Sequence, residues 1–301
     1  MNNMVYHIPV MLDKCISGLD IQPNGIYVDL TFGGGGHSKE ILKHLDKGHL
    51  YGFDQDPDAA SNVPDNDRFT FVMANFRDVK RYLKIFGVQQ VDGILADLGI
   101  SSHQIDEPKR GFSTRFEGEL DMRMSQSGDL TAATILNQYS EERLHRIFGI
   151  YGEVKNAKTL AKAVVSYRAM KHFDSIPDFR KLLDNHAPRG KSSKYSAQVF
   201  QALRIEVNQE MAALEEMLEQ CIEILKPGGR LVVMSYHSLE DRMVKNFMSK
   251  GKLHGELEKD FYGNPIRPFE PVTRKALVAD EGEVERNKRA RSAKLRIAKR
   301  I

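Results

Sequence analysis

Short apolar runs alternate with segments of helical spacing over the first hundred residues, and this alternation constrains the fold more than any other feature. Four runs of six to eight residues have the length and apolar character of strands, at 26–31, 49–54, 68–75 and 91–97. Between the first two runs, apolar residues recur every three or four positions, as on one face of a helix. Strands that alternate with helices predict an α/β fold, in which helices cover both faces of a parallel sheet.

The alternation stops near residue 105 and resumes about a hundred residues later along the chain. Helical spacing dominates the interval, at 131–151, 154–171 and 177–186. A long amphipathic helix then begins near Val207, and an apolar run at 230–236 predicts a fifth strand. Two later segments predict a closing pair of strands, 275–281 and 293–299.

This order predicts two domains, one of which interrupts the other. Residues 1–104 and 207–301 form a discontinuous Rossmann-like sheet domain, and residues 105–206 form an inserted all-helical domain. A chain of 301 residues is long enough for both domains to bury a core.

Cysteine usage and hydropathy narrow the class of protein. Cys15 and Cys221 lie far apart, outside any Cys/His ligand spacing, so we expect no disulfide framework, zinc finger or other metal site. There is no run of about 18 apolar residues and no basic, then apolar, secretory leader. We therefore expect a cytoplasmic protein that makes no contact with a membrane.

The formal net charge of +3 conceals two basic zones. Residues 143–204 hold thirteen Lys or Arg against four Asp or Glu, and residues 286–301 hold eight Lys or Arg and no acidic residue. Zones of this kind are typical of surfaces that bind nucleic-acid phosphates. Solvated helix faces give the same pattern, so charge alone leaves both interpretations open.

A glycine-rich turn, 33–36, follows the first predicted strand, and helical spacing begins at His37. Such a turn lets the backbone approach a ligand closely, and the helix N-terminus favours negative groups. Asp54 ends the next strand about twenty residues later, where a carboxylate accepts hydrogen bonds from a ribose diol. The two features predict a nucleotide-containing cofactor, although neither the G-x-G-x-x-G fingerprint nor a P-loop is present.

Asp97 ends the fourth predicted strand, and the active sites of open α/β sheets lie beyond the carboxyl ends of their strands. The spacing Asp29-x-x-x-Gly33-x-Gly35 resembles the first motif of class I S-adenosylmethionine-dependent methyltransferases, especially those that act on exocyclic amines. In those enzymes an acidic residue at the position of Asp97 opens an Asp-Pro-Pro-Tyr motif and helps to hold the target amine. Pro-Pro-Tyr is missing here, so an aromatic residue that contacts the base has to come from elsewhere. Asp97 could instead cap its loop or touch the cofactor.

Longer motifs resemble one family over nearly the whole chain, the bacterial small-subunit ribosomal RNA cytosine-N(4) methyltransferases. The matching segments are 28–38, 97–102, 110–113, 120–124, 204–208, 237–242 and 289–292. Several of them are specific to this family. The resemblance implies a class I methyltransferase sheet with a helical insert and S-adenosylmethionine as the methyl donor. It also implies that the acceptor is a cytidine of 16S ribosomal RNA in the decoding region of the small subunit.

The resemblance also assigns residues to the donor: Gly35, Gly36, His37, Asp54, Phe76, Asp97 and Gln104. It places the glycines and His37 in the cofactor loop and Asp54 on the ribose. Phe76 would lie beside the adenine, and Asp97 and Gln104 would flank the methionine end. The sequence alone favours a core aromatic for Phe76 and a surface amide for Gln104, and only the resemblance assigns them to the donor.

Roles toward the RNA rest on fewer observations. Arg110, Phe112 and Arg123 would grip the RNA and stack a base, but Arg123 with Asp121 could equally form a structural ion pair. His237 follows the fifth strand at the same sheet edge as Asp97, so it could take the proton lost after transfer. A structural histidine would occupy the same position.

Three other functions stay open. The amine-methyltransferase motifs would also suit a DNA substrate. The basic zones would suit an RNA-binding assembly factor that keeps the cofactor pocket as a relic. A nicotinamide-dependent dehydrogenase is disfavoured by the incomplete dinucleotide fingerprint. The sequence leaves open whether the protein is a monomer or a homodimer.

Overall fold

A computed structural model describes residues 9–301 and divides the chain into two compact units. The first, here the sheet unit, is formed by the chain up to Gly99 and by Ala212–Ile301; the second, the helical unit, is Ile100–Met211. The expected insert, 105–206, lies within the helical unit, which extends five residues further at each end. Residues 1–8 of the expected first domain lie outside the described residues.

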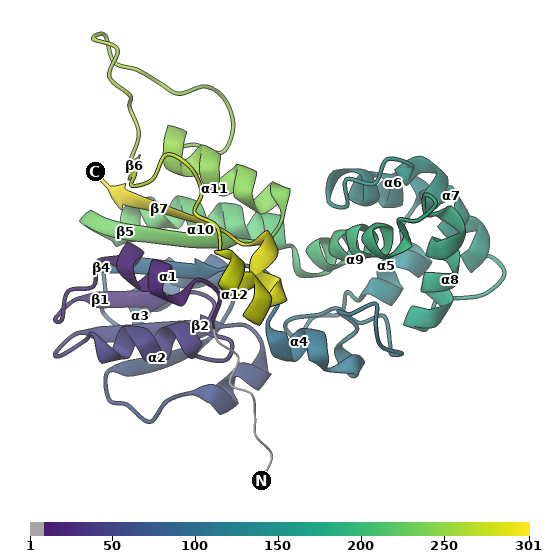
Figure 1. Ribbon diagram of the computed structural model, residues 1–301, viewed down its shortest axis with the longest axis horizontal. Helices are drawn as coiled ribbons and strands as arrows, with labels where there is room; N and C mark the ends of the chain where they lie inside the picture. Colours follow the sequence, from purple (N-terminus) through teal and green to yellow (C-terminus); the bar gives the residue numbers. More distant parts are fainter. Residues whose placement is uncertain (1–8) are drawn as a thin grey trace. The chain divides into compact units, whose positions relative to one another are not determined.

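The sheet unit contains one seven-stranded sheet with the order β3-β2-β1-β4-β5-β7-β6 (Figure 1). The strands are β1 (Ile26–Asp29), β2 (His49–Asp54), β3 (Phe69–Met73), β4 (Val91–Asp97), β5 (Leu225–Ser235), β6 (Phe269–Pro271) and β7 (Lys294–Arg300). Strands β1 to β5 are parallel, and β7 runs antiparallel to both of its neighbours, β5 and β6. This topology confirms the predicted Rossmann-like α/β sheet with a helical insert.

Helices lie on both faces of this sheet (Figure 1). They are α1 (Leu12–Leu19), α2 (Gly36–Lys43), α3 (Val79–Ile85), α10 (Glu210–Ile224), α11 (Ser238–Lys250) and α12 (Glu281–Arg286), with short 3-10 helices η1 (Pro57–Asn62), η2 (Phe76–Asp78) and η4 (Lys288–Ser292). Side chains of α1 and α2 pack with Leu95, Val232 and Ile297 in one buried cluster. Helix α10 lies beside α3, since the Lys80 backbone N–H donates to Gln220 Oε1 at 3.0 Å.

The predicted strand at 275–281 is wrong. Leu277 makes one isolated bridge with Leu295, while β6 occupies the edge beside β7. The Asp280 side chain accepts a hydrogen bond from the Glu283 backbone N–H at 2.8 Å, so the end of the predicted segment caps α12.

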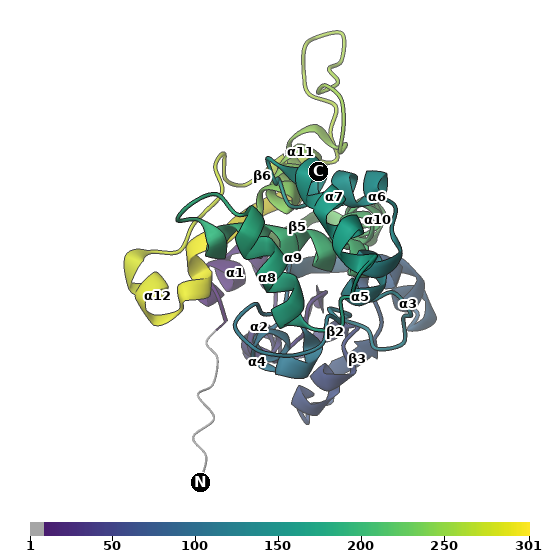
Figure 2. The same ribbon diagram turned by 90° about the vertical axis from the view of Figure 1, so that its right-hand side faces the viewer.

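The helical unit consists of six α-helices in the part of the chain described (Figure 2). They are α4 (Ser102–Asp106), α5 (Ala132–Gln138), α6 (Glu141–Ile150), α7 (Ala157–Arg168), α8 (Ile176–His186) and α9 (Ser192–Asn208). The predicted helix at 131–151 is two helices, because the Ser140 side chain accepts from the Arg143 N–H and starts α6. The helix predicted from Val207 begins at Glu210 instead, because Gln209 adopts a left-handed backbone (φ 50°) that ends α9.

No helix in residues 9–301 combines the length and the apolar character that crossing a membrane requires.

Candidate active site

Three aspartates gather at the carboxyl edge of the sheet, because three neighbouring parallel strands end there. Asp29, Asp54 and Asp97 are the last residues of β1, β2 and β4. Asp29 is in register with Gly52 of β2 and Leu95 of β4, so each neighbouring strand continues two residues past it. We call this group the carboxylate edge. It lies where open α/β sheets place their ligands.

Asp54 fixes the glycine turn. Its Oδ2 accepts from the Gly33 backbone N–H at 2.7 Å, and its Oδ1 accepts from the Asp56 N–H at 2.9 Å. Burial nevertheless raises the pKa of Asp54 to about 6, since desolvation outweighs these two hydrogen bonds. A hydrogen bond therefore holds the glycine turn, which the resemblance assigns to the methyl donor, to Asp54, which it assigns to the ribose of that donor.

Gly35 needs its lack of a side chain. Its backbone is left-handed (φ +72°), and a Cβ there would lie 2.9 Å from the Phe32 ring. Gly36, the first residue of α2, would place a Cβ 2.3 Å from the Pro9 ring. At Gly34, by contrast, a Cβ would meet no atom within 4 Å, so that face of the turn is open. The turn offers bare backbone at this face, which suits close approach by a ligand.

Asp97 is held by two hydrogen bonds and lies near His37. Its Oδ1 accepts from the Tyr236 hydroxyl at 2.7 Å, its Oδ2 lies 3.9 Å from His37 Nδ1, and its backbone N–H donates to Thr31 Oγ1 at 2.6 Å. Burial raises the pKa of Asp97 to about 6, while His37 and the Tyr236 hydrogen bond oppose that rise. The side chain is 24% exposed, so a ligand at the edge can reach it.

His37 faces Asp97 with one nitrogen and anchors the chain with the other. Its Nε2 lies 3.2 Å from the Val10 carbonyl oxygen, which can only accept, so Nε2 carries a proton. The neutral ring then presents an Nδ1 lone pair toward Asp97, and the protonated ring presents an N–H. At 3.9 Å the ring makes no hydrogen bond to Asp97, and the role expected for His37 at the donor stays a prediction.

Tyr236 is a site residue that the sequence analysis missed. It follows β5 directly, and its phenol crosses to the end of β4 to reach Asp97. Burial and the neighbouring carboxylates raise the pKa of Tyr236 well above its ordinary value, so the hydroxyl stays a donor. The available signal was its position: the predicted fifth strand ends at the same edge as Asp97.

His237 makes the contacts of a structural histidine. It precedes α11, where its Nδ1 accepts from the Glu240 N–H at 3.4 Å and its Nε2 lies 3.1 Å from Glu240 Oε1. Its side chain is 8% exposed. The geometry favours the structural alternative, and a role in taking the proton stays a prediction.

Phe76 and Gln104 lie in different units. Phe76 begins η2 after β3, partly buried at the carboxyl edge of the sheet. Gln104 is buried in the helical unit, where its Oε1 accepts from the Ser101 N–H at 3.0 Å and completes a capping box for α4. The roles expected for both residues at the donor stay predictions.

The expected RNA grip of Arg110 and Phe112 is not supported by their surroundings. Arg110 is buried, and its Nη2 donates to the carbonyl oxygens of Arg123 and Met124, both at 3.0 Å. Phe112 packs in the core of the helical unit. Both side chains are used inside the fold, and a role of either toward RNA stays a prediction.

Arg123 forms the structural ion pair that the sequence left as its alternative. Its Nη2 lies 2.7 Å from Asp121 Oδ2, and its Nη1 donates to the Gln126 and Gly128 carbonyls. Asn208 ties down the same loop, accepting from the Met124 N–H at 2.7 Å. The family motif 120–124 therefore builds a loop, and no contact with RNA follows from it.

Comparison with known proteins assigns the chain to a family. The profile of the MraW methylase family matches residues 4–301. The chain is 59% identical to the ribosomal RNA small subunit methyltransferase H of Cytophaga hutchinsonii over 298 residues, covering 98% of this chain and 100% of the relative. The protein of the same name from Phocaeicola vulgatus is 56% identical, with 98% of each chain covered.

Among solved structures, an rRNA methylase from Streptococcus thermophilus is 12% identical, with a TM-score of 0.40 over 96% of this chain and 93% of that one. The family assignment rests on the profile and on the close relatives, which cover the chain almost from end to end. The chain belongs to the MraW methylase family.

Proposed function

We propose that this protein transfers a methyl group from S-adenosylmethionine to the exocyclic N4 amine of a cytidine in 16S ribosomal RNA, within the small ribosomal subunit and hence in the cytoplasm. The names of its close relatives support the RNA substrate. The observation that carries the chemistry is Asp97, a reachable carboxylate at the carboxylate edge with one oxygen held by Tyr236.

The residues of the carboxylate edge fit the methyl donor. The open face at Gly34 lets an amino-acid or ribose moiety approach the backbone, and Asp54 has lone pairs beyond the two that its backbone donors use. Phe76 lies at the same edge and offers an aromatic surface for adenine. When bound, the donor supplies a methyl group on a positively charged sulfur.

The acceptor needs help, because the exocyclic amine of cytosine delocalises its lone pair into the ring. A hydrogen bond from the amine to Asp97 Oδ2 aligns the nitrogen and favours its pyramidal form. The nitrogen then forms a bond to the methyl carbon while the sulfur–carbon bond breaks and its electrons go to sulfur. The acidic N-methyl ammonium that results gives its proton to Asp97 or to water, so a strong base is unnecessary.

The helical unit supplies cations for the RNA phosphates. Lys155, Lys158 and Lys162 are exposed at intervals of three and four residues at the start of α7 and along it, and none has an ion-pair partner among residues 9–301. Lys158 and Lys162 are four residues apart within α7 and so lie on one side of it, while Lys155 lies in the turn just before the helix. Phosphate contacts by such residues release counterions and drive binding.

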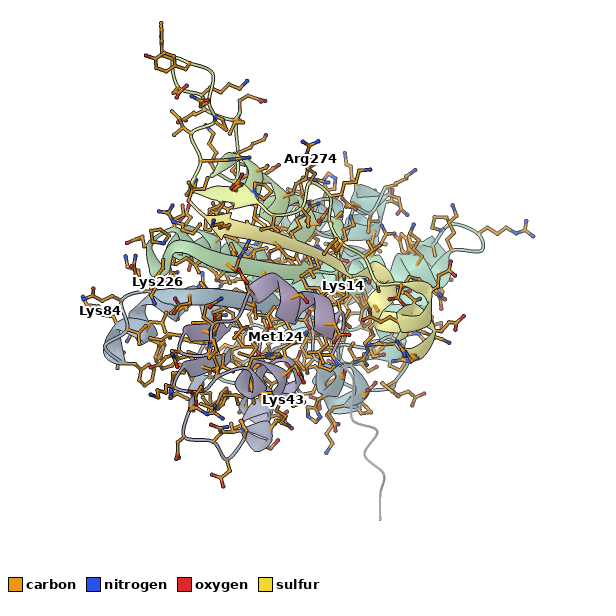
Figure 3. The ribbon with its side chains drawn as sticks, turned by 60° about the vertical axis from the view of Figure 1, so that its left-hand side comes forward. Lys14, Lys43, Lys84, Met124, Lys226 and Arg274 are labelled. Carbon is orange, nitrogen blue, oxygen red and sulfur yellow. The ribbon has the colours of Figure 1, made fainter. Side chains whose placement is uncertain are left out.

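The basic C-terminal zone divides into a structural and an exposed part. Lys294 and Arg296 of β7 pair with Asp241 at 3.1 and 2.7 Å. Lys288 and Arg291 of η4 are exposed just before β7, whose first residue is in register with Ser235 at the carboxyl edge of β5. Lys84 and Lys226 lie at the other end of the sheet, where β5 begins (Figure 3). We assign the exposed cations of η4 to the RNA beside the target.

The test is methyl transfer from labelled S-adenosylmethionine to small subunits that lack the modification, followed by nuclease digestion and mapping of the label. We expect label on N4 of one cytidine. Label on carbon or ribose would contradict the amine assignment, and transfer to plasmid DNA without transfer to ribosomal RNA would favour the DNA alternative. Deproteinised 16S RNA in parallel shows whether the assembled subunit is the substrate, and sedimentation of the free enzyme distinguishes a monomer from a homodimer.

A further inference from the structure

We propose that Tyr236 is a positioning residue for methyl transfer: its hydroxyl occupies Oδ1 of Asp97, so that Oδ2 alone is presented to the target amine. This inference rests on the role proposed above for Asp97. Tyr236 comes from just after strand β5, and its hydroxyl is committed to Asp97.

The geometry commits the Tyr236 hydroxyl to Asp97. The phenol oxygen lies 2.7 Å from Asp97 Oδ1, a short distance typical of a hydroxyl that donates to a carboxylate. The same residue is anchored through its backbone, whose N–H donates to Glu240 Oε2 at 2.9 Å. Glu240 is buried and caps α11, so the start of that helix fixes Tyr236 beside Asp97.

Capture of Oδ1 gives the carboxylate a direction. A free carboxylate rotates about its Cβ–Cγ bond and offers either oxygen, whereas one with a fixed donor on Oδ1 holds Oδ2 in place. In this structure Oδ2 faces His37 Nδ1 at 3.9 Å, a gap longer than a hydrogen bond. The carboxylate thus keeps an oxygen available to an incoming amine, which is the orientation that catalysis by proximity requires.

The groups around Asp97 make its charge sensitive to this one hydrogen bond. The pKa of Asp97 depends on four neighbours: His37 of α2, Asp29 of β1, Tyr236 after β5 and Glu240 of α11. The charge of Asp97 in turn raises the pKa of Cys15 of α1. Asp29 and Glu240 raise the pKa of Asp97, and His37 and Tyr236 lower it. Without the phenol hydroxyl, only His37 opposes the rise in the pKa of Asp97 that Asp29 and Glu240 cause. Asp97 therefore stays protonated up to a higher pH in such a variant.

The experiment measures the pH dependence of kcat/KM for the full-length Tyr236→Phe variant, from mildly acidic to mildly alkaline pH. The substrates are labelled donor and unmodified small subunits. We expect the acidic limb to move up by about one pH unit, since a hydrogen bond to the charged form is lost. Activity at the acidic end then falls about tenfold relative to the parent, and the loss shrinks as the pH rises.

Tyr27→Phe is the matched control. Tyr27 is a buried tyrosine of β1 whose hydroxyl accepts from the Gln22 N–H at 2.7 Å. This substitution also removes one phenol hydroxyl from the sheet unit, and we expect the pH profile of the variant to parallel that of the parent.

A second measurement reads the charge of Asp97 directly. The carboxyl carbon of Asp97, in protein labelled with 13C-aspartate and assigned with Asp97→Asn, should titrate at higher pH in Tyr236→Phe whether or not that variant turns over. An unshifted titration, or a loss of activity equal at every pH, would overturn the inference.

The two proposals fail in different ways. Full activity of Asp97→Asn would refute the role of Asp97 itself and, with it, the proposed chemistry. An inactive Asp97→Asn together with a Tyr236→Phe variant that matches the parent at every pH would refute only the role of Tyr236.

Discussion

The sheet unit and the helical unit treat charged groups in opposite ways. The sheet unit places partly buried carboxylates at the carboxyl edge of its strands, where desolvation raises the pKa of both Asp54 and Asp97 to about 6. The helical unit has an apolar core and exposes its lysines, and its buried Arg110 is used to hold a loop. In the sheet unit, the carboxylates proposed to act in methyl transfer also lower the stability of the fold. In the helical unit, the residues that stabilise the fold differ from the lysines proposed to bind RNA.

The largest expected effect comes from removing the charge at the carboxylate edge. Asp97→Asn keeps the shape and can still accept from Tyr236, but it loses the negative charge that holds the amine and can receive the proton. We expect kcat to fall by about 10²–10⁴-fold, the range of a positioned acid–base group, measured as single-turnover methyl transfer. Thermal unfolding of the variant serves as the control for folding. An unchanged kcat in Asp97→Asn would show that the sheet unit does not use this carboxylate for methyl transfer, and the contrast with the helical unit would not hold.

The second effect is a pH dependence of stability that the partly buried carboxylates Asp54 and Asp97 impose. Between the ordinary value of 3.8 and about 6, the folded protein binds more protons at Asp54 and Asp97 than the unfolded chain does. The free energy of unfolding should therefore fall as the pH rises through this window, by about 1–3 kcal/mol for each group, and stay lower above it.

Urea unfolding of the parent and of Asp54→Asn, at a series of pH values that spans this window, measures the fall in unfolding free energy. Other groups also titrate near this window, since burial lowers the pKa of His49 and raises the pKa of Asp29. The difference between the parent and Asp54→Asn isolates the share that Asp54 contributes. We expect the fall to be smaller in the variant. An identical slope in both proteins would contradict the expectation.

The third effect tests the buried cation of the helical unit. Arg110→Ala leaves the Arg123 and Met124 carbonyls without this donor, so we expect a loss of about 1–3 kcal/mol in unfolding free energy. Arg115→Ala is the matched control, because that side chain is 69% exposed and its change should lie within about 0.5 kcal/mol. Equal stability of the two variants, measured by thermal unfolding, would show that Arg110 is not structural.

The smallest expected effect on the fold comes from the exposed lysines. Lys155→Ala, Lys158→Ala and Lys162→Ala combined should leave stability within about 0.5 kcal/mol per site, yet weaken binding to 16S RNA. Each lost phosphate contact should reduce the salt slope of log K by about 0.7–0.9. Lys171→Ala is the control, since that lysine already pairs with Asp178 at 2.8 Å. An unchanged salt slope would exclude these three lysines from the RNA contact.

Features set by local pattern were predicted well from the sequence. Strands β2 and β4 have the predicted bounds, and Asp54 and Asp97 end them as expected. The failures depend on contacts distant in sequence. Strand β6 has three residues and exists because β7 pairs with it, so its own pattern is too short to detect.

The site shows the same division. Asp97 was predictable from its place at a strand end, but Tyr236 lies 139 positions away and becomes a partner only when β4 and β5 pair. Arg110 and Arg123 share a sequence pattern with RNA-binding arginines, and only burial and the Asp121 pair reveal their structural use.

The interruption of the sheet unit also has a consequence for the order in which the chain folds. The helical unit is one continuous segment, whereas β4 and β5 are separated by more than a hundred residues and have to close a long loop before they pair. Local helical contacts form faster than distant strand pairs. During synthesis the helical unit can therefore be complete while the carboxylate edge still lacks β5 and Tyr236, so the ability to hold the target amine is acquired late.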